Sequence, residues 1–383
     1  MGDGGGGGGG ELEELPAPVG VERYREVLRE EAGVEVGPLE LAALAAEDAV
    51  RIEARMDVLA GRIRGGEASP GAWGEVFEEL RRDHPEDAAA VLEAYRREVE
   101  RARAFVAERG LLDPPEGPLE VVETPAIFPP GRYPLIAYLG YRLALTVESG
   151  EDLANHCRVC IPPLAVHETF PGHHAAFLIR RGAAADPVAG APDRPGDATA
   201  GAGGSGSSDE LRELSAAHFK NRFFHEGWGQ YAELLMLESG YYAGEPEREL
   251  GAWRNLLFRV ERARVDALLH AGRISPEDAR EVLADYLNRE TAGDELRRHL
   301  AEPTFKAAYY VGALQVLELR EAVRAAEPAF DLRDFHHRLV AWPFPVPEAA
   351  HLRFGVEIGP GLPAGGLPTF LAGQADPRRE GTP

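Results

Sequence analysis

The sequence predicts a mainly α-helical protein with few short strands, folded as a single domain. Three observations lead to this prediction. Apolar residues recur three and four positions apart over long stretches between residues 21 and 326, strand-like alternation is scarce, and no repeat period emerges. Hydrophobic residues make up 44% and charged residues 27% of the 383 residues, a balance that allows a large buried core.

The domain is expected to span residues 12–358. Residues 1–11 contain seven consecutive glycines and are expected to form a flexible tail, because glycine has a high backbone entropy and no side chain to bury. They show neither the basic nor the apolar region of a signal peptide. Helices are expected between residues 21 and 109, in segments such as 39–59 and 73–80.

Two segments interrupt the helical pattern. Residues 113–134 contain seven prolines, which remove backbone donors, and are expected to form an extended connection with a short strand at 119–122. Residues 182–209 are rich in Gly, Ala, Pro, Asp and Ser and are expected to form a flexible insertion.

Helical periodicity returns after the insertion. The expected helices cover residues 211–237, 249–270, 276–287 and 309–326. The third of these has the residues of a helix N-terminus, because Ser275 and Pro276 are followed by Asp278. The Pro- and Gly-rich residues 359–383 are expected to form a second tail.

Charge and cysteine content exclude several classes of protein. The chain has 41 basic and 64 acidic residues, a net charge of −23 that repels nucleic acid, and it has no cluster of Lys and Arg. No stretch reaches the roughly 18 apolar residues that a membrane span needs. Cys157 and Cys160 form a C-x-x-C pair without a second ligand pair, so two ordinary thiols are favoured over a zinc or redox site. A cytoplasmic protein is therefore expected.

The segment HETFPGHH, residues 167–174, is the most informative part of the chain. It is similar to the zinc signature H-E-x-x-H, in which two histidines four apart bind the metal and the glutamate polarises water. Here position 171 is proline, so the standard second ligand is missing.

Helix geometry leaves open which histidine replaces that ligand. On a regular helix His173 lies roughly 240° round from His167, and His174 lies ~10.5 Å along the axis, so neither would share a zinc ion with His167. Pro171 and Gly172 favour a local bulge that would bring His173 back. The alternative is a helix-breaking turn with two incidental histidines.

A second segment, HEGWGQYAE at residues 225–233, supplies carboxylates on an expected helix. Glu226 is the candidate third metal ligand, and Glu233 lies seven positions later on the same face, where it could fix a histidine tautomer. Acidic residues that merely solvate a helix surface are the alternative. That alternative is weakened by the aromatic company of Phe223, Phe224, Trp228 and Tyr231.

Together these segments resemble the bacterial proteins grouped as domain of unknown function 885, a family assigned to the zincin-like metallopeptidase clan. The family pattern is H-E-x-x-P-G-H-H followed by E-G-W-x-x-Y-A-E, and the resemblance covers roughly residues 15–350. It implies a helical, gluzincin-like fold around a zinc cleft. It continues through a helix pattern R-x-x-R-x-x-x-D-x-x-x-H, which falls here on Arg259, Arg262, Asp266 and His270.

The spacing of three, four and four places this last set on one helical face, independently of the resemblance. The set is either a surface ladder of ion pairs or a polar stripe that faces a cleft and binds a substrate carboxylate or an oxyanion. Tyr309 and Tyr310, where the family has Y-x-x-G, offer phenols for the same task, although a core aromatic is the more common use of a tyrosine.

These observations favour a zinc-dependent hydrolase acting on a peptide or small amide. His167, His173 and Glu226 would bind one Zn²⁺, and Glu168 would act as general base. His270, Arg262 or Tyr309 would stabilise the oxyanion. Supporting or substrate-contacting positions are assigned to His174, Glu233, Arg259, Asp266 and Tyr310. The alternative is a non-catalytic helical binding protein with a structural metal site, and the sequence decides neither the cleavage position nor the oligomeric state.

Overall fold

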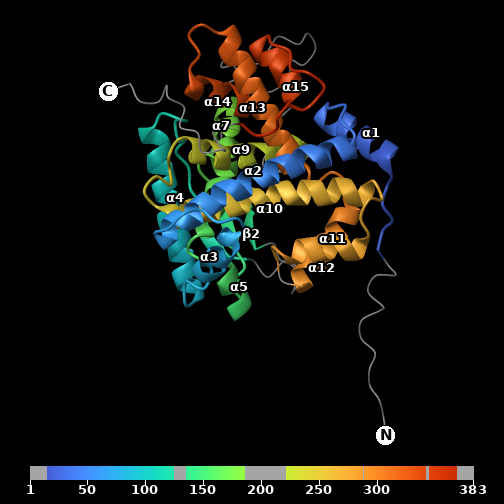
Figure 1. Ribbon diagram of the computed structural model, residues 1–383. Coiled ribbons are helices and arrows are strands. Elements are labelled where there is room, and N and C mark those ends of the chain that lie inside the picture. Colours follow the sequence, from blue (N-terminus) through green and yellow to red (C-terminus); the bar gives the residue numbers. More distant parts are fainter. Residues whose placement is uncertain (1–14, 125–134, 186–220, 288, 342–344, 369–383) are drawn as a thin grey trace.

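The computed structural model describes residues 15–124, 135–185, 221–287, 289–341 and 345–368, and the protein is mainly α-helical, as predicted (Figure 1). The predicted tail 1–11, residues 186–209 of the predicted insertion and residues 369–383 lie outside these ranges.

The helices before the site region are α1 (Val21–Ala32), α2 (Pro38–Arg64), α3 (Ala72–Leu80), α4 (Ala88–Glu108) and α5 (Gly150–Asn155). The site region contributes α6 (Ile161–Glu168), α7 (His173–Ala185), α9 (Arg222–Glu238) and α10 (Pro246–His270). The remaining helices are α11 (Pro276–Ala284), α12 (Arg289–Ala301), α13 (Ala308–Ala326), α14 (Leu332–Val340), α15 (Val346–Ala349) and the π-helix η1 (Ala350–Phe354).

Two pairs of long helices form the centre of the molecule. Helix α2 packs along α10, and α13 packs along α9 (Figure 1). Glycines allow the second pair to approach closely, because a Cβ atom on Gly227 would collide with the backbone of Gly312, and one on Gly312 would overlap the carbonyl oxygen of Phe223. The glycine of the EGW motif is therefore required by the contact between α9 and α13.

A small mixed sheet of three strands lies beside these helices. Strand β1 (Glu120–Glu123) pairs in parallel with β3 (Arg142–Leu145), and β2 (Ile136–Tyr138) pairs with β3 in the antiparallel direction. The predicted strand at 119–122 corresponds to β1, whereas β2 and β3 were not predicted. Residues of β2 line the cavity described below.

The buried side chains form one large core and a smaller second one. The large core contains residues of α2, α9, α10 and α13 together with α1, α4 and α6. The smaller core joins the C-terminal half of α10 to α11 and α12, through Val265, Leu269, Leu283 and Leu296. The pair α11–α12 is thus attached to the molecule through a core of its own (Figure 1).

Part of the segment predicted as a C-terminal tail packs against α2. Leu367 is buried, and its backbone N–H donates to the Asp48 carboxylate at 2.9 Å. The same carboxylate accepts a hydrogen bond from the Tyr310 hydroxyl at 2.5 Å. Residues up to 368 therefore continue the folded domain.

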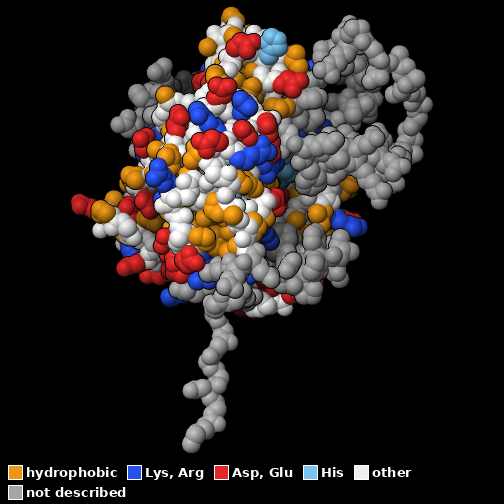
Figure 2. Space-filling view, turned by 90° about the vertical axis from the view of Figure 1, so that its right-hand side faces the viewer, with side chains coloured by type: hydrophobic (Ala, Val, Ile, Leu, Met, Phe, Trp, Pro, Cys, Tyr) orange, Lys and Arg blue, Asp and Glu red, His pale blue; other side chains and the backbone are white. Residues whose placement is uncertain are grey.

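The surface carries charges of both signs. On the face shown in Figure 2, acidic and basic side chains are interspersed with apolar ones over the described residues. None of the helices within the described ranges combines the length and the apolarity needed to cross a membrane.

Candidate metal centre

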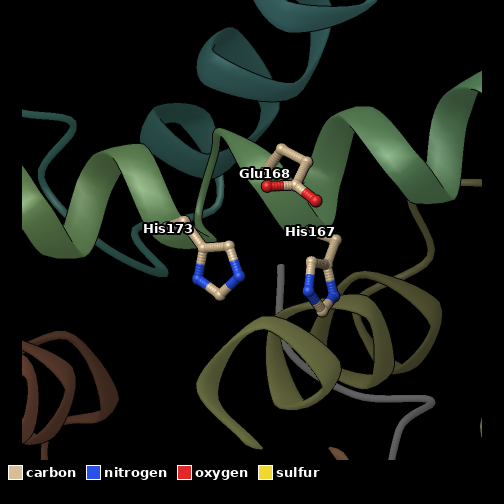
Figure 3. A group of neighbouring side chains, drawn as sticks. All are labelled: His167, Glu168 and His173. Atoms are coloured by element: carbon tan, nitrogen blue, oxygen red, sulfur yellow. The ribbon is translucent and has the colours of Figure 1, made fainter. Parts of the chain in front are cut away.

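The chain between His167 and His173 breaks into two helices. Helix α6 ends at Glu168, a cis Phe170–Pro171 peptide follows, and α7 starts at His173. The predicted bulge within one helix is therefore replaced by a turn. The turn still places His173 beside His167. Their ring centroids lie 4.7 Å apart, and both rings point to the same side (Figure 3). Gly172 is required here, since a Cβ atom would overlap the carbonyl oxygen of His167.

Helix α9 holds this turn and supports His167. The Trp228 indole N–H lies 3.0 Å from the carbonyl oxygen of Pro171 and 3.2 Å from that of Gly172, and donates to both. Gly229 provides space for the His167 ring, because a Cβ atom there would lie 2.5 Å from the ring carbon Cε1. The EGWG residues thus position the histidines of the other motif.

The carboxylate of Glu226 completes a group of potential metal ligands. Its Oε2 atom lies 3.4 Å from His167 Nε2 and 3.7 Å from His173 Nε2. Ligand atoms around a tetrahedral ion with bonds of ~2.0–2.1 Å are separated by roughly 3.3–3.5 Å. Both distances are close to this separation, so the Glu226 carboxylate can share a cation with either histidine.

Two overlapping sets of ligand atoms meet the distance condition for a metal site. One set is His167, Glu168 and His173, and the other is His173, His225 and Glu226, each with its ligand atoms within 4.8 Å of one another. The His225 ring stacks on His173 with centroids 3.7 Å apart. His225 was not predicted as a site residue, although it directly precedes Glu226 in the motif.

A second layer of hydrogen bonds orients His167. Its Nδ1 atom lies 2.7 Å from Glu233 Oε1, and the other oxygen of Glu233 accepts from the Asn255 amide at 2.6 Å. A carboxylate behind a metal-binding histidine fixes the tautomer and ring orientation. Glu233 lies where the sequence predicted such a partner. Asn255 was missed, although it precedes Arg259 by one turn of α10.

The charges of the site favour a cation. Burial alone would lower the pKa of His167, but the Glu226 and Glu233 carboxylates outweigh it and raise that pKa to about 9. Burial would raise the pKa of Glu226, yet hydrogen bonds from His167 and His173 hold it well below its ordinary value. The pKa of Glu168 is raised, chiefly because its carboxyl is buried. Buried carboxylates thus bind positive charge here, whether protons or a metal ion.

A cavity of about 630 Å³ opens onto this group. Glu168, His173 and Glu226 line one part of it, and Arg259 and Tyr309 also line it. The Tyr309 ring stacks on His167 with centroids 5.8 Å apart and an interplanar angle of 26°. Residues of β2, α5, α10 and α12 also line the cavity, and Figure 1 shows β2 and α5 below α10 to one side and α12 to the other.

The predicted stripe on α10 divides between two environments. Arg262 lines the cavity and lies 2.6 Å from Glu295 Oε1. Asp266 accepts hydrogen bonds from Tyr24, His299 and the backbone N–H of Thr304. All four side chains of the stripe are buried, so the surface ladder of ion pairs is wrong.

His270 is not brought together with the other predicted catalytic residues. It is fully buried, its Nδ1 accepts from the backbone N–H of Val19, and its Nε2 donates to the carbonyl oxygen of His299. It does not line the cavity within the part of the chain that the structure describes. Its contacts make it an anchor for the segment before α1.

Tyr310 and His174 also point away from the metal-ligand group. Tyr310 donates to Asp48, as described above. The Tyr138 hydroxyl lies 2.9 Å from His174 Nδ1, and burial, together with the charge of Arg103, lowers the pKa of His174 to about 4. Of the two adjacent histidines, His173 is therefore the one directed at Glu226.

Comparison with known proteins identifies the family. The model of the bacterial protein of unknown function DUF885 matches residues 9–342. The chain belongs to this family. The zincin clan membership implied by the motifs is not shown by this match. No curated protein matches the sequence.

Two solved structures have a similar fold. One is a protein from Colwellia psychrerythraea provisionally described as a lipoprotein, with 20% identity and a TM-score of 0.70 over 89% of this chain and 57% of that one. The other, from Shewanella oneidensis, is provisionally described as a lipoprotein of unknown function, with 22% identity and a TM-score of 0.66 over 88% and 60%. The DUF885 chain thus spans less than two thirds of either protein.

The prediction of a cytoplasmic protein with two ordinary thiols is wrong. Cys157 and Cys160 form a disulfide just before α6, and disulfides are rare in the reducing cytoplasm. This pairing could not be predicted, because free thiols and metal ligands also occur as two cysteines three positions apart.

Proposed function

We propose that this DUF885 protein is a zinc-dependent peptidase. The observation that carries the proposal is the contact of Glu226 with both His167 and His173, together with the overlapping ligand set that adds Glu168, at the wall of a cavity large enough for a peptide segment. Nitrogen and carboxylate ligands from three side chains, with a position left for water, are typical of catalytic rather than structural zinc.

Glu168 has the environment of a general base and acid. Burial raises the pKa of this carboxyl, and it lies next to both histidines (Figure 3). Bound zinc would supply Lewis acidity toward the substrate carbonyl. Glu168 would take a proton from the attacking water as the new C–O bond forms. It would then give that proton to the amide nitrogen as the C–N bond breaks.

Tyr309 is the best placed donor for the developing oxyanion. Its ring lies against His167, it lines the cavity, and burial keeps the phenol protonated by raising its pKa. Arg262, the second predicted donor, is held by Glu295. His270, the third, is bonded at both ring nitrogens. We therefore assign the oxyanion contact to Tyr309.

We also propose that the protein works outside the cytoplasm, in the cell envelope or beyond it. The disulfide between Cys157 and Cys160 and the lipoprotein descriptions of the two solved relatives support this location. Cell fractionation followed by mass spectrometry without reductant would test it. Reduced protein in the cytoplasmic fraction would contradict it.

Zinc content and hydrolysis of a mixed peptide library, measured on the same preparations, test the enzymatic function. Purified protein should hold roughly one zinc per chain. His167→Ala should lose most of the zinc and the hydrolysis, whereas His351→Ala, which changes an exposed histidine paired with Glu357, should keep both. Zinc without hydrolysis in the wild type would favour a non-catalytic binding protein. Zinc retained in His167→Ala would show that the proposed zinc site is wrong.

A further inference from the structure

Arg259 is a buried cation of the cavity that forms no ion pair with any residue that the structure describes. The Arg259 side chain is only 9% exposed, and its Nε atom is buried without a hydrogen-bond partner among the described residues. Its close contact is with a π-face, since its guanidinium carbon lies 4.3 Å from the centroid of the Tyr309 ring. Burying a charge without a hydrogen-bonded partner is unfavourable, so buried arginines are usually paired.

The other buried cations of the cavity are already bound. Arg262 and Lys306 both contact the carboxylate of Glu295, at 2.6 Å and 3.2 Å. The nearby carboxylates are also occupied, because Glu233 is bound by His167 and Asn255, and Glu226 faces the two histidines. Arg259 is attracted by these carboxylates at a distance but forms no ion pair with them in the described part of the chain.

The position of Arg259 relative to the reacting groups is fixed by Tyr309. This ring contacts both His167, with ring centroids 5.8 Å apart, and Arg259, whose guanidinium carbon lies 4.3 Å from the ring centroid. A single residue of extended peptide spans roughly 3.3–3.6 Å. The α-carboxylate of the residue after a scissile amide at Glu168 is the next charged group of such a substrate, and Arg259 is near enough to Glu168 and Glu226 to be acted on by their charges.

We propose that Arg259 binds the free α-carboxylate of the residue that follows the cleaved bond, so that the enzyme removes amino acids from the C-terminal ends of peptides. The proposal rests on the peptidase function and names its substrate class. A guanidinium binds a carboxylate through two parallel hydrogen bonds, which fixes the register of the peptide. Phe258 and Phe305 line the same cavity and favour an apolar terminal side chain.

Binding to a variant that cannot turn over separates this proposal from the peptidase function. The probe is N-acetyl-Ala-Ala-Phe with a free carboxylate, compared with the same peptide as its C-terminal amide. Calorimetry on zinc-loaded Glu168→Gln should show the acid bound roughly 10-fold or more tightly than the amide, the strength of a charge-assisted pair. In Glu168→Gln/Arg259→Gln the two forms should bind equally.

Two further variants guard against indirect effects. Arg259→Lys keeps the charge without the planar fork and should retain a reduced preference for the acid. Arg298→Gln, in the Glu168→Gln background, removes an exposed cation of the same cavity and should keep the full preference. Zinc content and thermal unfolding of every variant check that the site is intact.

The outcomes distinguish the two proposals. An acid preference that disappears with Arg259 supports the carboxylate site, even if the wild type hydrolyses nothing. Equal affinity for acid and amide in Glu168→Gln, binding of neither, or a preference that survives Arg259→Gln would each overturn it. Hydrolysis of acid and amide peptides at the same rate would overturn it while leaving the peptidase function in place.

Discussion

Glu168 and Glu226 are neighbouring buried carboxylates with different contacts. Glu226 reaches the Nε2 atoms of both histidines, where a metal ligand must lie. Glu168 belongs to the other set of potential ligands and lines the cavity beside His173. The first carboxylate is therefore assigned to metal binding and the second to proton transfer.

Substitution by glutamine should separate these two tasks. Glu168→Gln keeps the shape of the side chain and should retain zinc, while hydrolysis falls by roughly 10²–10⁴-fold or more because the proton acceptor is lost. Glu226→Gln should lose much of the zinc, since a neutral amide is a poor ligand for it. Elemental analysis and initial rates measure both. Equal zinc loss in the two variants would mean that base and ligand are interchanged.

The adjacent histidines should also differ. His173→Ala removes a ring that lies 3.7 Å from Glu226 and should lose metal. His174→Ala removes a ring bonded to Tyr138 and should keep metal while lowering stability by about 2 kcal/mol or more, because a buried side chain leaves a cavity. Zinc content and urea unfolding test this pair. Zinc lost from His174→Ala alone would reverse the assignment.

Sequence reasoning identified residues of the candidate metal centre but not all of its surroundings. The motifs carry His167, Glu168, His173 and Glu226 because ligands and base come in fixed local spacings. Asn255 could not be predicted, since its role depends on how α10 packs beside α9. For the same reason, the sequence could not show that Arg259 lines the cavity and His270 does not, although both lie on one face of a single helix.

At the scale of elements, a helix start set by neighbouring residues was predicted correctly, whereas strands that pair across the sequence were missed. Ser275 and Asp278 form the capping box that starts α11, as their spacing predicted. Strands β2 and β3 are only three and four residues long, and β3 lies between β1 and β2. Strands of this length show little alternation, and only β1, equally short, was predicted, within the proline-rich connection.

A buried histidine links three elements and should make the fold sensitive to acid. His336 on α14 lies 2.7 Å from the Tyr231 hydroxyl of α9, and its Nδ1 donates to the carbonyl oxygen of Leu111 after α4. Burial lowers its pKa to about 3. An unfolded chain takes up this proton near pH ~6.5, so the free energy of unfolding should fall between about pH 6.5 and pH 3.

Replacing this histidine should weaken that pH dependence. The His336 contribution has a slope of up to about 1.4 kcal/mol per pH unit, and His336→Gln should remove it while lowering stability at neutral pH. Urea unfolding at several values between about pH 4.5 and 6.5 measures the slope. His351→Gln, at an exposed site, should behave as the wild type. An unchanged slope in His336→Gln would show that its pKa is not lowered.

At the scale of the whole molecule, the two hydrophobic cores suggest two levels of stability. Helices α2, α9, α10 and α13 share the large core, whereas α11 and α12 pack mainly on each other and on the end of α10. Residues of α12 and the loop before it also line the cavity. Substrate access is therefore bordered by the part of the protein that has the smaller hydrophobic core.

We expect α11 and α12 to open without unfolding of the rest. Segments with a small core of their own exchange amide hydrogens through local opening, so α11 and α12 should exchange faster than α2 and α10.

Glu295 on α12 ties this pair to Arg262, and Glu295→Gln leaves buried cations without an anion. Exchange in α12 should then rise roughly 10-fold or more, with α2 unchanged. Glu277→Gln, at an exposed position of α11, should have little effect. Hydrogen-exchange mass spectrometry resolves these helices, and equal protection of α2 and α12 would show that both cores unfold together.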